Sequence, residues 1–208
     1  MFAPGAGRYL GAAAALLLFF ALLPVVRAFP LSLPWAIALT AGFAAWAFVA
    51  AFFRDPERAP GDGIVSAADG RVRAVDRQGE TLRISVFMNV TNVHVNRFPL
   101  DGKVSAIAGS GRGFRAAFRP SADENVQRHY TLSTELGAVE VVQITGVVAR
   151  RLVSFVEVGS AGRKGDRLGM IAFGSRVDVH LPADRVVPLV KVGDRVHAGS
   201  TSIARVVP

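Results

Sequence analysis

Two long apolar runs stand out in the hydropathy pattern at the N-terminal end of the chain. Residues 9–26 and 35–53 hold almost no charged or strongly polar side chains. Each run is close to the ~20 residues that an α-helix needs to cross the hydrocarbon core of a bilayer. The proline-containing stretch 27–34 between them is typical of a tight turn. We therefore expect a helical hairpin that anchors the chain in a membrane, either by spanning the bilayer or by re-entering one leaflet.

The pattern changes after Pro56 and Pro60, which end the helical part. From there on, short alternating runs rich in Val, Ile, Phe and Thr are separated by Gly and Asp, a pattern that predicts strands and tight turns. The expected strands include residues 70–75, 81–87, 139–144 and 176–181. The sequence thus predicts a β-rich (mainly β with minor α) globular domain over residues 54–208, preceded by the α-hairpin of residues 1–53.

One irregular stretch, residues 112–130, interrupts this strand pattern. We expect a short helix there, near residues 122–127. Two aromatic residues of the same stretch, Phe114 and Phe118, could insert into lipid or fill the core of the domain, and we expect them in the core.

The net charge of the chain indicates which partners it can bind. The net charge is +8, and residues 1–53 contribute +2 of it through Arg8 and Arg27, so the domain carries +6. A basic domain tethered to a bilayer is attracted to an anionic membrane surface. There is no run of Lys and Arg and no nucleic-acid-binding motif, so we expect no nucleic acid partner.

The basic residues that flank the apolar runs predict an orientation. Arg8 precedes the first run, and Arg54 and Arg58 follow the second, whereas the turn holds only Arg27. Because basic residues favour the cytoplasmic side, we expect both ends of the hairpin and the domain to face the cytoplasm from the inner membrane of the cell.

The types of residue in the chain exclude several kinds of catalytic site. The chain has no cysteine and only three lysines, and its four histidines form no closely spaced pair. Thiolate chemistry is excluded, and we expect no metal site. An enzyme that removes CO2 from an amino acid needs an electron sink, a group that stabilises the carbanion left behind. Pyridoxal phosphate is one such group, but the three scattered lysines and the lack of a phosphate-binding loop argue against it. A pyruvoyl group, built from a serine of the chain itself, needs none of these residues.

A Gly-Ser pair that could be cleaved occurs four times, at 109–110, 159–160, 174–175 and 199–200. Only Gly174-Ser175 lies between two strand-like runs, where the backbone can be held in a strained geometry. By spacing alone, a plain turn or bulge is the better explanation of this pair.

Five blocks of sequence resemble the short, bacterial and archaeal type of phosphatidylserine decarboxylase. They occur in the family's order and cover the chain from about Phe53 to its end. The block around Gly174-Ser175 is the most specific of them. The blocks are residues 53–58 (FRDPER), 68–70 (ADG), 93–97 (VHVNR), 146–151 (GVVARR) and 173–178 (FGSRVD).

The resemblance implies a self-cleaving proenzyme. Ser175 would attack the carbonyl of Gly174, and elimination would leave a pyruvoyl group at position 175, with chains 1–174 and 175–208 staying associated. His94 would be the general base that activates Ser175, and Asp69 would orient His94. The pyruvoyl group would form a Schiff base with phosphatidylserine, release CO2 and yield phosphatidylethanolamine. A homo-oligomer is compatible with this scheme.

The match to the family has departures. Residues 89–92 (NVTN) stand where many relatives carry a Pro and an Asp, and Arg97 stands where the longer enzymes have a second histidine. Any acidic helper at the first place is therefore lost.

Two other functions stay open at this point. The glycine spacing of residues 192–200 is also typical of a lipoyl-like β module, as in a non-enzymatic membrane adaptor. A membrane serine hydrolase would instead keep Ser175 intact. Taken singly, Asp69 is more typical of a turn, and His129, His180 and His197 are typical of hydrogen-bonded strand histidines.

Overall fold

The computed structural model describes the chain except for residues 28–32, 116, 118–119, 148–150, 173–174 and 208. The backbone contacts divide the chain into two compact units, Met1–Pro56 and Glu57–Pro208. The division falls a few residues after the boundary expected at 53/54. Each unit is described by itself.

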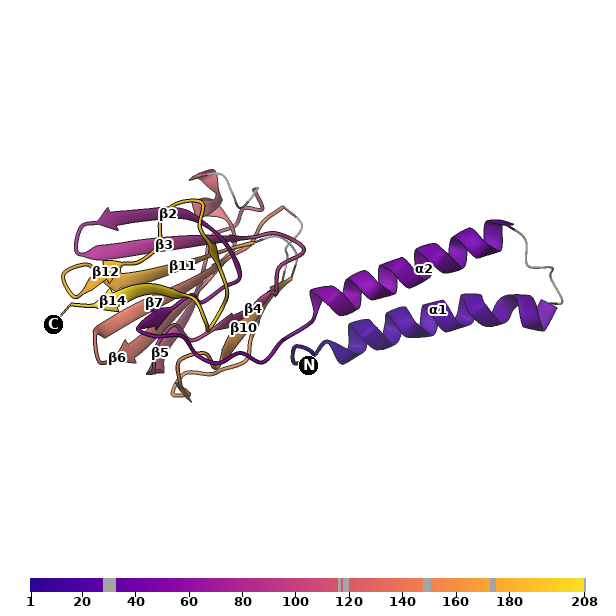
Figure 1. Ribbon diagram of the computed structural model, residues 1–208, viewed down its shortest axis with the longest axis horizontal. Helices are drawn as coiled ribbons and strands as arrows, with labels where there is room; N and C mark the ends of the chain where they lie inside the picture. The colour runs from indigo at the N-terminus through magenta and orange to yellow at the C-terminus, as the bar shows by residue number, and fades with distance from the viewer. Residues whose placement is uncertain (28–32, 116, 118–119, 148–150, 173–174, 208) are drawn as a thin grey trace. The chain divides into compact units, whose positions relative to one another are not determined.

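The first unit is a hairpin of two apolar helices. Helix α1 covers Gly7–Arg27 and helix α2 covers Leu33–Phe52, and they run side by side in opposite directions (Figure 1). A Cβ atom at Gly42 would lie 3.2 Å from Cδ1 of Leu17, so glycine allows the helices to approach closely. By length and composition, α2 can cross a membrane, whereas the apolar stretch of α1 within Gly7–Leu22 is shorter.

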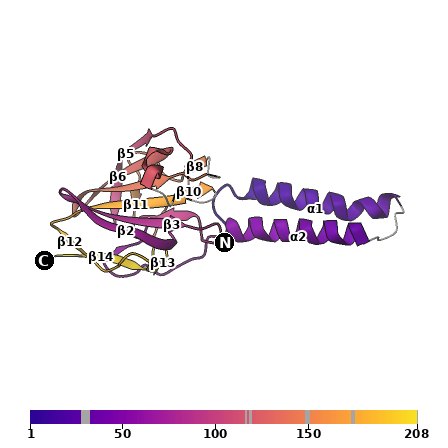
Figure 2. The same ribbon diagram turned by 90° about the horizontal axis from the view of Figure 1, so that it is seen from above.

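The second unit is built on a large antiparallel sheet (Figure 2). Eight strands form it in a fixed order: β13 (Arg195–Val196), β2 (Gly70–Gln78), β3 (Thr81–Met88), β11 (Ser175–Pro182), β7 (Gly137–Ile144), β6 (Gln127–Thr134), β5 (Gly102–Ser110) and β9 (Ala161–Gly162).

Two smaller sheets complete this unit. One contains β1 (Ile64–Val65), β14 (Ser202–Val206) and β12 (Val186–Pro188). The other contains β4 (Val95–Arg97), β10 (Arg167–Ala172) and β8 (Arg151–Ser154). The predicted fold class is therefore confirmed: a β-rich domain follows a helical hairpin.

Strand β11 lies near the middle of the large sheet and is buried along most of its length. It pairs with β3 on one side and with β7 on the other. Val177 and Val179 are 1% exposed, and the polar Asp178 between them is only 2% exposed. Because both faces are covered, β11 does not alternate between buried and exposed residues in the way that a half-solvated strand does.

The irregular stretch contains a short 3-10 helix, η1, at Pro120–Glu124. It overlaps the expected helix at 122–127, but the chain has already entered β6 at Gln127. The expected burial of Phe114 is wrong, because this side chain is 40% exposed. Fully buried Asn125 anchors the loop through the backbone of Arg115 instead, with both hydrogen bonds 2.7 Å long. Phe118 lies outside the described residues.

Candidate active site

Ser175 lies where the chain passes from one sheet into another. Strand β10 ends at Ala172 in the sheet of β4 and β8, and β11 begins at Ser175 in the large sheet, with only residues 173–174 between them. Ser175 is fully buried opposite Met88, and its hydroxyl donates to the Met88 sulfur at 3.4 Å. Gly174, the other half of the predicted cleavage site, lies outside the described residues.

His94 is fully buried just before β4, and its carbonyl accepts a hydrogen bond from the amide of Ile171 on β10 at 3.3 Å. Its Nδ1 atom is 2.9 Å from the carbonyl oxygen of Asn92. A carbonyl can only accept, so Nδ1 carries the proton and the lone pair belongs to Nε2. The backbone thus selects the tautomer that leaves Nε2 as the basic nitrogen.

Asp69 is nearly buried at the start of β2 and has its own set of partners. Arg58 binds its carboxylate with the two terminal guanidinium nitrogens, Nη1 and Nη2, at 2.5 and 2.9 Å. The amide of Ala198 donates to the carboxylate at 2.8 Å, and Nδ1 of His197 lies 3.6 Å away. These partners neutralise the carboxylate and hold it in place.

The described contacts of Asp69 do not include His94. The backbone nevertheless brings the two residues toward each other, because residues 65–67 run antiparallel to 97–99 through hydrogen bonds of 2.8 and 2.9 Å. Among the described contacts of His94, the Asn92 carbonyl is a group that orients its ring. The orienting role of Asp69 stays a prediction.

A chain of buried amide groups, which the sequence analysis missed, ends at the same methionine as Ser175. The hydroxyl of Tyr130 donates to Gln143 at 3.3 Å, and Gln143 donates to Asn96 at 2.8 Å. Asn96 in turn donates to the Met88 sulfur at 3.6 Å. The only signal for it in the sequence is a polar residue, Gln143, inside the apolar strand run Val141–Ile144.

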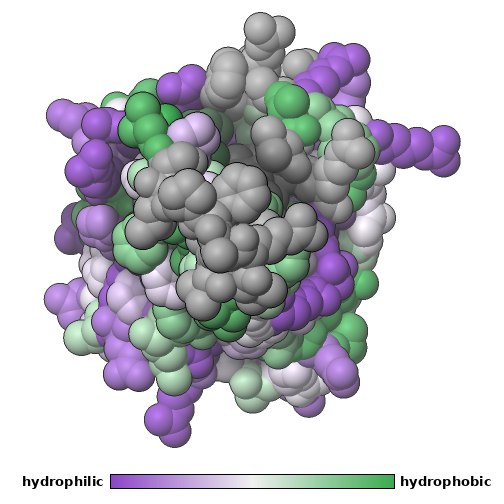
Figure 3. Space-filling model, turned by 90° about the vertical axis from the view of Figure 1, so that its right-hand side faces the viewer, coloured by the Kyte–Doolittle hydropathy of each residue, from purple (hydrophilic) through white to green (hydrophobic). Residues whose placement is uncertain are grey.

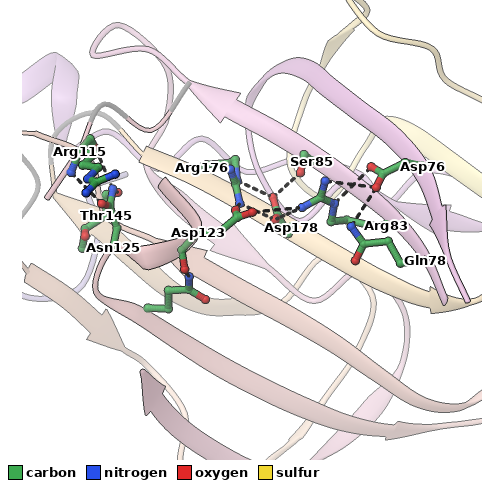
Figure 4. A network of polar contacts seen from close by, with 11 residues as sticks. Asp76, Gln78, Arg83, Ser85, Arg115, Asp123, Asn125, Thr145, Arg176 and Asp178 are labelled. Atoms are coloured by element: carbon green, nitrogen blue, oxygen red, sulfur yellow. Dashed lines mark hydrogen bonds and ion pairs between the residues drawn. The ribbon is translucent and has the colours of Figure 1, made fainter. Parts of the chain in front are cut away.

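A network of ionic contacts begins at the next residue of β11 (Figure 4). Arg176 binds Asp178 and also Asp123 of η1, while Ser85 donates to Asp178 at 2.5 Å. Burial alone would lower the pKa of Arg176, but Asp178 and Asp123 outweigh it and raise that pKa above its ordinary value. The network therefore fixes the start of β11 to η1 with the guanidinium fully charged.

The remaining histidines differ from one another. His129 and His180 lie in strands as predicted, and His129 bridges Glu140 and Ser110 at 2.8 Å each. Desolvation lowers the pKa of His180 below its ordinary value of 6.5, although Asp178 and Glu140 oppose the shift. The prediction for His197 is wrong, because its side chain is 54% exposed beyond the end of β13 and faces Asp69.

The comparisons with known proteins agree on one class: the chain is a decarboxylase. Residues 46–204 match the family model described as phosphatidylserine decarboxylase. The chain is 46% identical, over 81% of its length and 76% of the relative's, to a phosphatidylserine decarboxylase proenzyme of Thermobifida fusca. It is 45% identical to a putative archaetidylserine decarboxylase proenzyme of Methanococcoides burtonii, over 76% of the chain and 75% of the relative.

A phosphatidylserine decarboxylase proenzyme of Streptomyces griseus is 41% identical over 88% of the chain and 89% of its own length. The chain therefore belongs to the phosphatidylserine decarboxylase family.

Proposed function

We propose that this chain is a proenzyme that cleaves itself between Gly174 and Ser175 and then decarboxylates phosphatidylserine. The observation that carries the proposal is the burial of Ser175 at the passage between two sheets, in a chain whose family and relatives are decarboxylase proenzymes. The serine hydroxyl there has only a weak sulfur acceptor among the described residues. A hydroxyl so weakly held can leave its partner and attack the adjacent carbonyl.

The proposed cleavage is balanced in its atoms. The Ser175 oxygen attacks the Gly174 carbonyl, and the amide becomes an ester as the C–N bond breaks. Elimination breaks the bond between Cβ and the ester oxygen, which frees the Gly174 carboxylate and leaves dehydroalanine at 175. Water then enters and ammonia leaves, which gives the pyruvoyl group.

His94 is the proposed general base for these steps. The Asn92 carbonyl leaves Nε2 as its basic nitrogen, and an imidazole has an unperturbed pKa near neutrality. Asp69 would contribute by favouring the charged form of His94, while Arg58 limits the negative charge that Asp69 presents.

The smaller chain, 175–208, is expected to stay bound after cleavage. Its strand β11 is hydrogen-bonded to β3 and to β7, and β14 pairs with β1. These ladders hold the two pieces together, because all three partner strands belong to chain 1–174.

A pyruvoyl carbonyl at position 175 would supply the electron sink that an amino acid needs to lose CO2. Its precursor fits this role, since Ser175 is buried beside the apolar Met88 where bulk water is excluded. His94 would return a proton to the carbon that loses CO2. The charge of +6 outside residues 1–53 favours an anionic membrane surface, and the apolar α2 fits an anchor in the inner membrane.

Denaturing electrophoresis with intact-mass measurement tests the proposal. Purified protein is expected to give two pieces, the smaller beginning at residue 175 with a pyruvoyl group. Ser175→Ala is expected to stay in one piece, whereas Ser200→Ala, at another Gly-Ser pair, is expected to cleave normally. Uncleaved protein that still releases CO2 from phosphatidylserine would contradict the proposal. An adaptor or a serine hydrolase would also give a single chain.

A further inference from the structure

A cavity of about 490 Å³ lies at the end of the large sheet where Ser175 begins β11. Its walls are the end of β5 at residues 109–111, residues 126–128 at the start of β6, and Arg151 and Leu152 at the start of β8. This volume is typical of cavities that bind small molecules or headgroups.

The strand registers connect this cavity to Ser175. Arg176 and Gln127 both lie opposite Ile144, and the amide of Thr145 donates to the Val126 carbonyl at 3.0 Å. Val126 is therefore two strands away from Ser175, roughly 10 Å at the usual strand spacing. In the smaller sheet, Arg151 of the cavity wall lies opposite Ala172, just before the predicted cleavage site. The strand registers of both sheets therefore place the cavity wall near the expected reaction centre.

The wall of the cavity favours an anion. Arg128 and Arg151 are its charged lining residues, and no lining residue that the structure describes is acidic. Arg128 donates to the Leu152 carbonyl at 3.0 Å, which fixes its guanidinium across the cavity from β6 to β8. Guanidinium groups are well suited to phosphate because their planar donors match its oxygens.

The loop at the edge of the cavity is held rigidly. Gly111 has a φ of 73°, and a Cβ atom there would lie 1.8 Å from the Asn125 carbonyl oxygen, so only glycine fits. The side chain of Asn125 donates to the Thr145 carbonyl at 2.7 Å and so ties this edge to the end of β7. A preformed wall of this kind lowers the ordering cost of binding.

We propose that this cavity binds the phosphate of the aminophospholipid substrate, with Arg151 and Arg128 as the phosphate-binding residues. The inference rests on the proposed function, because it assigns the phosphate site of that reaction. The shared chemistry is a phosphate anion, which a lipid headgroup or free phosphate could supply.

Kinetics on the mature, cleaved protein with dihexanoyl phosphatidylserine test the assignment. Arg151→Gln and Arg128→Gln are expected to raise KM tenfold or more, as the loss of a charge-assisted hydrogen bond implies, and to lower kcat far less. Arg185→Gln is the matched control. It removes an exposed arginine from a separate cavity near Lys164, and KM is expected to change less than twofold.

A second measurement does not depend on turnover. Dihexanoyl phosphatidylcholine has the phosphate but no primary amine, and its binding to the mature protein is measured by calorimetry. Arg151→Gln is expected to weaken this binding tenfold, with an unchanged melting temperature and complete self-cleavage. Binding of inorganic phosphate as tight as that of the lipid, and equally weakened by the variant, would overturn the lipid assignment.

The outcomes separate the two proposals. If wild-type protein cleaves itself and releases CO2 while both arginine variants keep the wild-type KM, the phosphate site is wrong and the proposed function stands. If wild-type protein neither cleaves nor releases CO2, the proposed function itself fails.

Discussion

Asp69 is bound by Arg58, whose Nη1 and Nη2 atoms lie 2.5 and 2.9 Å from the two carboxylate oxygens. Arg58 also donates to the Ala198 carbonyl at 3.0 Å, so one guanidinium joins the segment after the hairpin, the start of β2 and the end of β13. The carboxylate that the resemblance assigns to catalysis is thus also a structural ion pair.

Replacing Arg58 is expected to affect both stability and processing. Arg58→Gln leaves the nearly buried Asp69 carboxylate short of two charged hydrogen bonds, which should cost about 1–3 kcal/mol in the free energy of unfolding. Self-cleavage should slow as well, because the carboxylate loses its fixed position. Urea unfolding and a time course on denaturing gels measure the two effects. Arg73→Gln, an exposed arginine of β2, should stay within about 0.5 kcal/mol of wild type. Unchanged cleavage and stability in Arg58→Gln would refute the prediction.

Asp178 should be the most sensitive member of the network in Figure 4. It is 2% exposed and is shared by Arg176, Arg83 and Ser85. Asp178→Asn leaves the buried Arg176 guanidinium undercompensated, and breaking such a pair costs about 3–5 kcal/mol. Thermal unfolding measures the loss. Asp76→Asn removes a more exposed partner of Arg83 and should cost no more than about 1 kcal/mol. Equal losses in the two variants would contradict the expected effect of burial.

The buried amide chain predicts a cost for an apolar replacement. Asn96→Leu removes the acceptor of Gln143 in a fully buried site, and an unsatisfied buried donor costs about 1–3 kcal/mol. Chemical denaturation detects this loss. Gln78→Ala at the exposed end of β2 is the control and should be nearly neutral. A loss in Asn96→Leu no larger than that of the control would show that the buried amide chain contributes nothing to the stability of the protein.

His180 predicts a dependence of stability on pH. Its pKa is lowered in the folded state, chiefly by desolvation, from the ordinary value of 6.5. Below that value the unfolded chain binds more protons than the folded chain, so this contribution is complete above pH 6.5 and is lost as the pH falls. His180→Gln should therefore lose less stability than wild type between pH 7.5 and pH 5.5. Urea unfolding at each pH gives the free energy of unfolding. If this free energy falls with pH in parallel for the two proteins, this role for His180 is excluded.

The absence of cysteine from the sequence makes the orientation directly testable. A single Cys at Asp184, an exposed turn residue of the domain, should react with a membrane-impermeant maleimide only after the cells are permeabilised. The cysteine-free parent protein is the control. Labelling in intact cells would place the domain on the outer side and reverse the predicted topology.

Hydrophilic side chains spread around the outline of the molecule in the view of Figure 3. That distribution agrees with the change of pattern after Pro60, where polar residues separate the short apolar runs. The strands at 70–78, 81–88 and 137–144 were predictable because alternation and turn residues are local properties. The loop that carries Phe114 was not, because the Asn125 side chain fixes it from a distance in sequence.

The sequence by itself determined the apolar hairpin, the strand-rich domain and the Gly174-Ser175 pair, since each depends on neighbouring residues. Only the tertiary structure decided that Asn92 selects the His94 tautomer, that Arg58 binds Asp69, and that Tyr130, Gln143 and Asn96 lead to the sulfur beside Ser175. The contacts of Tyr130, Gln143 and Asn96 join strands whose register depends on the packing of the whole domain, because a shift by one residue turns each side chain to the opposite face of the sheet.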